Sequence, residues 1–217
     1  GNIAIGLESL DDTAGNAHTG TIAIGHQSLT ACTTGAGNTA VGYESLKTAA
    51  TESQTVALGY QSMAIALPGS NGVFIGYKAG YDLSQGGDNN VAIGHESMSG
   101  THGGGSEKNT AVGSGTMAGA INAAARNTAV GYDAGAAITT ATDNVLLGSN
   151  SGDSITTANK CTFIGNSAGT AVTVTNSATS DGTVGIGYQA LTSLTTGEKN
   201  TAVGYTAGAE EVAGNDN

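Results

Sequence analysis

The hexapeptide Asn38-Thr39-Ala40-Val41-Gly42-Tyr43 decides the fold, because close variants of it recur twelve times along the 217-residue chain. Aligned on their glycines, successive copies lie 17 to 22 residues apart. A nearly constant period of this length is the signature of a repeat architecture. The twelve glycines are Gly6, Gly25, Gly42, Gly59, Gly76, Gly94, Gly113, Gly131, Gly148, Gly165, Gly187 and Gly204.

Two columns of the repeat predict a strand before each glycine. The residue just before the glycine is Ile, Val or Leu in every copy, and the residue three before it is Ile, Val or Thr. Side chains two apart lie on the same face of a strand, and β-branched residues suit its pleated surface. We expect this aliphatic face to be the one that the coil buries.

The column between these two is also apolar or small. It contains eight alanines together with Phe74, Leu146, Phe163 and Gly185. A sheet with one wet face would carry polar residues there, so both faces are expected to be covered. We predict that this second face packs laterally against other chains, most simply in a homotrimer.

Each glycine is predicted to allow a positive φ, or a close backbone approach, where the chain turns a corner. The third residue after the glycine is Ser, Ala or Thr, and the fourth is Leu, Met or Gly. The seventh is mostly apolar, as in Cys32, Leu83 and Ile138. Each coil should therefore contain further short inward-facing segments.

The composition fits a thin repeat better than a globular core. The chain has 36 Gly, two Phe, one Pro and no Trp, and stacked coils need few large side chains. We predict an all-β parallel β-solenoid of about twelve coils, forming a single repeat array over residues 1–217. The formal net charge of −11 disfavours nucleic acid as a partner, and no apolar run is long enough to predict membrane insertion.

Two ladders of like residues are expected when the coils stack. Tyr43, Tyr60 and Tyr77 share one column, for which interface packing or hydrogen bonding is favoured over a ligand platform. Asn occupies the position four before the glycine in seven coils, where stacked amides can hydrogen-bond from coil to coil. These residues are Asn2, Asn38, Asn90, Asn109, Asn127, Asn144 and Asn200.

Catalytic and metal sites are not indicated. Glu8, Glu44, Glu96 and Asp133 share a column but never occupy consecutive coils, whereas glycan cleavage needs two acids across one bond. No cofactor, metal or enzymatic activity is predicted.

Two histidines leave one metal alternative open. His26 and His95 share the column after the glycine but lie four coils apart. They could bind a metal only by meeting their symmetry copies in a trimer, and a surface or interface role is favoured.

The ends of the sequence suggest stacking. Gly1-Asn2 leads directly into a predicted strand, and the chain stops at Asn217, where another strand would be due. Bare ends of a repeat array present unpaired backbone groups. They predict either a segment of a longer fibre or a subunit that stacks head to tail in a filament.

Asn90-Val91-Ala92-Ile93-Gly94-His95-Glu96-Ser97 resembles the head repeat of trimeric autotransporter adhesins. Asn200-Thr201-Ala202-Val203-Gly204-Tyr205, preceded by Thr195-Thr196-Gly197, is similar to longer repeats of phage tail-fibre shafts. The resemblance extends over all twelve coils, although the period here is longer than in the adhesin heads. It implies a parallel β-roll in an extracellular, cell-surface or virion fibre.

The sequence thus predicts a structural fibre segment that acts as a rigid spacer and adhesin. Its partners would be copies of itself and a cell-surface glycan or protein receptor. The expanded connectors 99–108 and 170–181 are the expected recognition loops, since insertions in a solenoid lie on its outer surface. The alternative is a glycan-binding or glycan-cleaving tail spike.

Overall fold

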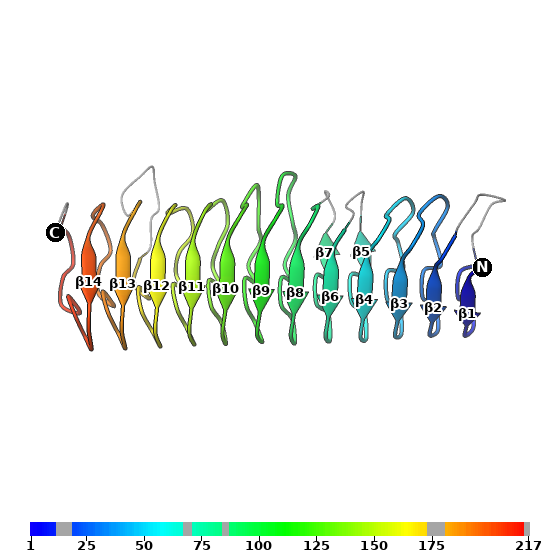
Figure 1. The fold of residues 1–217 in the computed structure, drawn as a ribbon, viewed down its shortest axis with the longest axis horizontal. Helices are drawn as coiled ribbons and strands as arrows, with labels where there is room; N and C mark the ends of the chain where they lie inside the picture. The colour runs from blue at the N-terminus through cyan, green and yellow to red at the C-terminus, as the bar shows by residue number, and fades with distance from the viewer. Residues whose placement is uncertain (12–18, 67–70, 84–86, 173–180, 215–217) are drawn as a thin grey trace.

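The protein is a parallel β-solenoid. The computed structural model describes residues 1–11, 19–66, 71–83, 87–172 and 181–214. Coils stack side by side along one axis, with the two termini at opposite ends (Figure 1). Throughout these described ranges the regular elements are all strands, and none of these residues forms a helix that could cross a membrane.

The predicted strands are all present, each three residues long. They form one twelve-stranded parallel sheet, called sheet A here. The strands are β1 (Ile3–Ile5), β2 (Ile22–Ile24), β3 (Thr39–Val41), β4 (Val56–Leu58), β6 (Val73–Ile75), β8 (Val91–Ile93), β9 (Thr110–Val112), β10 (Thr128–Val130), β11 (Val145–Leu147), β12 (Thr162–Ile164), β13 (Val184–Ile186) and β14 (Thr201–Val203). Equivalent residues pair, so that Thr39 lies opposite Val56 and Val41 opposite Leu58.

Differences in coil length do not disturb this register. The step from β12 to β13 includes the longest spacing, yet Thr162 pairs with Val184 and Ile164 with Ile186. The described connectors lie on one side of the stack, where their loops reach different heights (Figure 1). Two of these connectors form a small second sheet, in which β5 (Ile65–Ala66) pairs with β7 (Asp82–Leu83).

The strand face that points into the coil is the opposite of the one predicted. In β10 the central Ala129 is fully buried, whereas Val130 is 38% exposed. The other strands of sheet A from β2 to β13 also bury their central residue and leave the two flanking residues partly exposed. The central column, which includes Phe74 and Phe163, therefore fills the chain's own coil. The prediction that this column packs against other chains was wrong. The interior of a coil has little room, so small residues predominate in this column, and a large one such as Phe74 fits where glycine lies against it, as Gly80 does.

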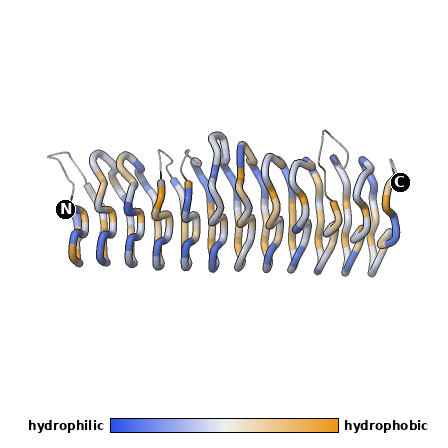
Figure 2. The backbone as a smooth tube through the Cα atoms, turned by 180° about the vertical axis from the view of Figure 1, so that it is seen from behind, coloured by the Kyte–Doolittle hydropathy of each residue, from blue (hydrophilic) through white to orange (hydrophobic). Residues whose placement is uncertain are grey.

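Large and small residues alternate to fill this interior. A Cβ atom on Gly80 would overlap the Phe74 ring, and one on Gly185 would lie 2.8 Å from Phe163. In most coils whose strand carries alanine, as at Ala40, a larger residue such as Leu46 is buried after the corner. The predicted inward positions beyond the corner are confirmed, since Leu46, Cys32 and related residues are fully buried. Hydropathy accordingly repeats from coil to coil (Figure 2).

The twelve glycines make the corner that follows each strand. Their φ angles lie between +131° and +143°, a region that residues with a Cβ avoid. A Cβ on Gly131 would also overlap the carbonyl oxygen of Gly148 in the next coil. Both a positive φ and a close backbone approach therefore require glycine here.

Candidate interaction surfaces

The first and third residues of the twelve strands form one surface, which we call the outer aliphatic face. All of these residues are Ile, Val, Leu or Thr, and none is charged. In the interior strands they are partly exposed, as for Val130. At ~4.8 Å per strand the face is ~58 Å long. The face is therefore a narrow, uncharged strip of β-branched and aliphatic side chains, in which the threonine hydroxyls are the only polar groups.

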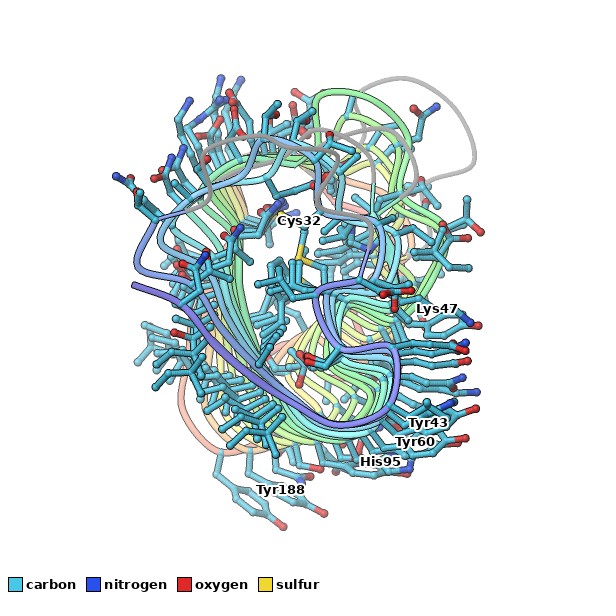
Figure 3. All side chains as sticks on the ribbon, turned by 90° about the vertical axis from the view of Figure 1, so that its right-hand side faces the viewer. Cys32, Tyr43, Lys47, Tyr60, His95 and Tyr188 are labelled. Carbon is cyan, nitrogen blue, oxygen red and sulfur yellow. The ribbon has the colours of Figure 1, made fainter. Side chains whose placement is uncertain are left out.

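A second surface is the aromatic ladder, formed by His26, Tyr43, Tyr60, Tyr77 and His95. Successive ring centroids are 5.3, 4.9, 5.6 and 5.0 Å apart, with interplanar angles of 11–24°. The rings project outward from the corner side of the coils (Figure 3). Tyr188 and Tyr205 form a second stack, with centroids 5.2 Å apart.

The ladder rings present mainly their edges to solvent. Tyr60 is stacked on both sides, by Tyr43 and Tyr77, yet it is 47% exposed. A sugar would normally stack on an aromatic face, and those faces are occupied by neighbouring rings. This geometry supports packing between coils rather than a carbohydrate platform.

Polar side chains flank the ladder. Glu44 accepts hydrogen bonds from Lys47 at 2.7 Å and from Gln61 at 2.6 Å. These bonds lower the pKa of the Glu44 carboxyl, while the Glu44 charge raises the pKa of the Tyr43 hydroxyl. A general acid for glycan cleavage needs a raised pKa, so the environment of Glu44 suits a structural role.

Glu8 and Glu96 share the column of Glu44, and neither has a second acid beside it in that column. Gln27 from the intervening coil donates to Glu8 at 2.5 Å. His95 lies 3.8 Å from the carboxylate of Glu96. Among the described residues, no group of three or more His, Cys, Asp or Glu side chains is placed to hold a metal ion.

The thiols lie inside the coils. Burial raises the pKa of Cys32 and raises that of Cys161 to about 11. At neutral pH both are protonated, which makes them poor nucleophiles.

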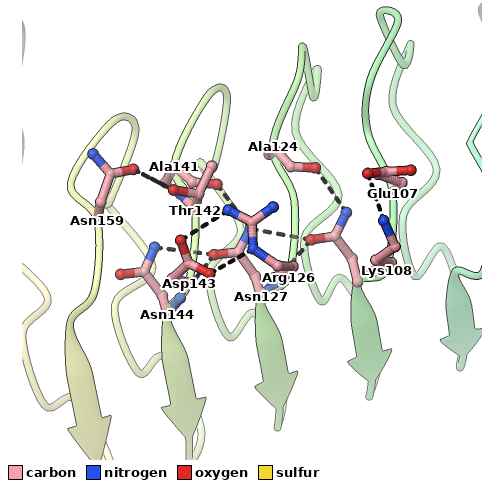
Figure 4. A network of polar contacts seen from close by, with 11 residues as sticks. Glu107, Lys108, Ala124, Arg126, Asn127, Ala141, Thr142, Asp143, Asn144 and Asn159 are labelled. Atoms are coloured by element: carbon pink, nitrogen blue, oxygen red, sulfur yellow. Dashed lines mark hydrogen bonds and ion pairs between the residues drawn. The ribbon is translucent and has the colours of Figure 1, made fainter.

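The asparagines form a buried ladder on the connector side of the strands (Figure 4). The Asn127 amide nitrogen donates to Asn109 Oδ1 at 3.1 Å and to the Ala141 carbonyl at 2.8 Å. Its Oδ1 accepts from the backbone N–H of Asn144 at 3.1 Å. Each amide thus ties its own coil to both neighbours.

The ladder is continuous from Asn90 to Asn144, whose Oδ1 accepts from the Cys161 N–H at 2.8 Å. Elsewhere single members make the same kind of contact. Asn2 and Asn38 accept from Thr21 N–H at 3.1 Å and Thr55 N–H at 3.0 Å, and Asn200 donates to the Gly214 carbonyl at 2.6 Å. Threonine fills the column at three gaps, Thr21, Thr55 and Thr183. The hydroxyls of Thr21 and Thr183 are buried without a hydrogen-bond partner among the described residues.

The residue preceding each asparagine points to solvent instead. Arg126 makes a bidentate pair with Asp143 of the next coil, at 2.6 and 2.9 Å (Figure 4). Hydrogen bonding to Arg126 lowers the pKa of Asp143. Because both groups are exposed, the pair contributes little to stability.

The sequence analysis missed a buried histidine in connector 99–108. His102 is fully buried, and neither of its ring nitrogens has a hydrogen-bond partner among the described residues. Burial lowers its pKa to about 4, against smaller opposing effects of the Met98 backbone and the Asp82 carboxylate. A histidine in a Gly-rich connector carries no periodic signal, since it lies outside the repeat columns. Most of the other expected recognition loop, residues 173–180, lies outside the described residues.

Comparisons with protein-family models, with curated proteins and with solved structures found no match to this chain.

Proposed function

We propose that the chain is a structural fibre segment, a rigid spacer whose copies associate laterally through the outer aliphatic face. The observation that supports this is an uncharged apolar strip along the whole sheet, on a chain with a net charge of −11. Monomeric proteins rarely leave a long contiguous apolar surface uncovered.

A second copy of the chain fits this strip better than an unrelated partner. With a width of roughly 10 Å, the strip covers on the order of 600 Å², close to the ~800 Å² that one partner contributes to a standard interface. Its ridges repeat at the strand spacing, so another copy offers matching grooves over the full length. A homotrimer buries the outer aliphatic face of each chain around one axis. Head-to-tail stacking of such assemblies stays a prediction from the sequence.

The resemblance to adhesin heads and tail-fibre shafts supports an extracellular, cell-surface or virion location for such a spacer. Adhesion to a glycan or protein receptor would use the connector side, where residues 99–108 extend from the stack (Figure 1). The coils supply spacing and stiffness, and the connectors can vary without changing the register.

Molar mass in solution tests the proposal. Light scattering should give a multiple of the 21.0 kDa chain mass, and Val130→Asp should shift dissociation to higher protein concentration by placing like charges across the interface. The matched control is Asn166→Asp, which adds the same charge at an exposed position off the face. Wild-type monomers at every concentration, or equal effects of the two variants, would overturn the proposal.

A further inference from the structure

The aromatic ladder places three tyrosines in an arrangement suited to oxidative coupling. Tyr43 and Tyr60 are stacked with centroids 4.9 Å apart and planes 11° apart, and Tyr60 and Tyr77 are 5.6 Å and 13° apart. Each ring belongs to a different coil. Tyr188 and Tyr205 repeat the arrangement at 5.2 Å and 11°.

These rings are also accessible. Tyr43, Tyr60 and Tyr77 are 39%, 47% and 40% exposed, and the labelled Tyr43 and Tyr60 point their hydroxyl ends away from the coil (Figure 3). A one-electron oxidant can therefore reach the phenols. Partly exposed side chains rotate on the picosecond to nanosecond timescale, which allows the ortho carbons of neighbouring rings to meet.

We propose that the ladder is a site of dityrosine formation between adjacent coils, with a haem peroxidase and hydrogen peroxide as the oxidising system. Each of two phenols loses one electron and one proton, giving two phenoxyl radicals. The radicals join by a carbon–carbon bond between ortho carbons. The hydrogen on each coupled carbon is then lost as a proton, and each oxygen regains one, which restores the hydroxyls. One peroxide is reduced to two waters.

The coupling is selective because the partner ring is already in place. Holding two reactants together replaces an encounter between molecules with an intramolecular step of high effective concentration. Tyr132 provides the contrast within the same chain, since it is 58% exposed but its column neighbours are Ser114 and Ser149. It can couple only to a tyrosine from elsewhere.

The cross-link would join coils that are otherwise held by hydrogen bonds and packing. A Tyr43–Tyr60 bond closes a loop of one coil between β3 and β4, and a Tyr60–Tyr77 bond does the same between β4 and β6. Lateral association through the outer aliphatic face is not required, because both rings come from one chain. This inference therefore stands or fails separately from the fibre proposal.

Peptide mapping by mass spectrometry tests the site. The full chain at low concentration is treated with a haem peroxidase and hydrogen peroxide, and three links are expected: Tyr43–Tyr60, Tyr60–Tyr77 and Tyr188–Tyr205. Tyr60→Phe keeps the ring stack but removes the central phenol, leaving Tyr43 and Tyr77 about 10 Å apart. It should lower the yield of links among residues 43–77 at least tenfold and leave the Tyr188–Tyr205 link unchanged.

Tyr132→Phe is the matched control, and it should change none of the three yields. Retention of the wild-type strand spectrum by both variants shows that the coils remain folded. The proposal is overturned if no dityrosine forms, if Tyr132 links between chains as readily as the ladder links within one, or if Tyr60→Phe still yields a Tyr43–Tyr77 link at the wild-type level.

Discussion

Ala129 and Val130 are neighbours in strand β10, and they occupy opposite environments. Ala129 is fully buried inside the coil, whereas Val130 lies on the outer aliphatic face and is 38% exposed. Both columns are apolar, so hydrophobicity does not distinguish them. Side-chain size does, because the narrow interior accepts Ala at most coils and the outer face has room for Val, Leu and Ile. In a thin solenoid, therefore, the larger apolar residues can lie on the outside.

Replacing each of these two residues in turn with aspartate is the strongest test of this comparison. Ala129→Asp places an unpaired carboxylate in the core at a cost of several kcal/mol, and we expect circular dichroism to show loss of the strand spectrum. Val130→Asp should retain that spectrum, since its side chain reaches solvent. Equal loss of structure in the two variants would contradict the assignment of faces.

A double-mutant cycle can sharpen the account of the interior. Phe74→Ala should cost about 3–5 kcal/mol through the cavity it leaves, and Gly80→Met alone should destabilise the chain because the new side chain overlaps the Phe74 ring. Gly80 has a φ of +59°, close to the +48° of Met63 in the same column. The double variant should therefore recover at least ~1 kcal/mol relative to the sum of the single changes, as measured by urea unfolding. Strict additivity would show that the two positions do not share volume.

Acidic pH should lower the free energy of unfolding, because the buried His102 must take up a proton. Its pKa is about 4 when folded and about 6.5 when unfolded, so between these values the unfolded chain binds more protons. The resulting stability is present above pH 6.5 and falls by about 3 kcal/mol as the pH drops to 4.

His102→Leu isolates this effect, because the variant lacks the titrating group. The comparison is needed because burial also raises the pKa of Glu52, which changes stability in the opposite direction as the pH falls. The free energy of unfolding of the wild type should fall more steeply than that of the variant over this range. Parallel curves would show that His102 is not buried in its neutral form.

The smallest expected difference in stability is between variants of two other adjacent residues, Arg126 and Asn127. Asn127→Ala removes partners of the buried Ala141 carbonyl and Asn144 N–H, which should cost about 1–3 kcal/mol. Arg126→Asn removes only an exposed ion pair, and the φ of +59° at Arg126 is close to the +60° of Asn89 in the same column. Its unfolding midpoint should stay near that of the wild type. A larger shift for Arg126→Asn than for Asn127→Ala would show that the exposed ion pair matters more for stability than the buried asparagine ladder.

The repeat columns predict the strands correctly, because Thr39, Ala40 and Val41 alternate sides wherever the motif recurs. They do not predict which side faces inward, since both are apolar and the width of the coil is a property of the whole stack. The matching of Phe74 with Gly80 is visible in the sequence only once the two columns are known to share one space. The burial of His102 and the β5–β7 pairing arise from connector contacts that have no period. The lateral association of copies and the role as a fibre segment are inferred from the outer aliphatic face, and both stay proposals.

The constant register also determines how the chain can fold. Each strand of sheet A pairs only with its neighbours one coil away, across a stretch of 17 to 22 residues. The entropy of closing loops of these two lengths differs by only about 0.2 kcal/mol. Topology therefore favours no coil as the starting point, and folding can nucleate at any adjacent pair and spread in both directions. The order in which coils form depends on their side chains, so those with the best-filled interiors should form first.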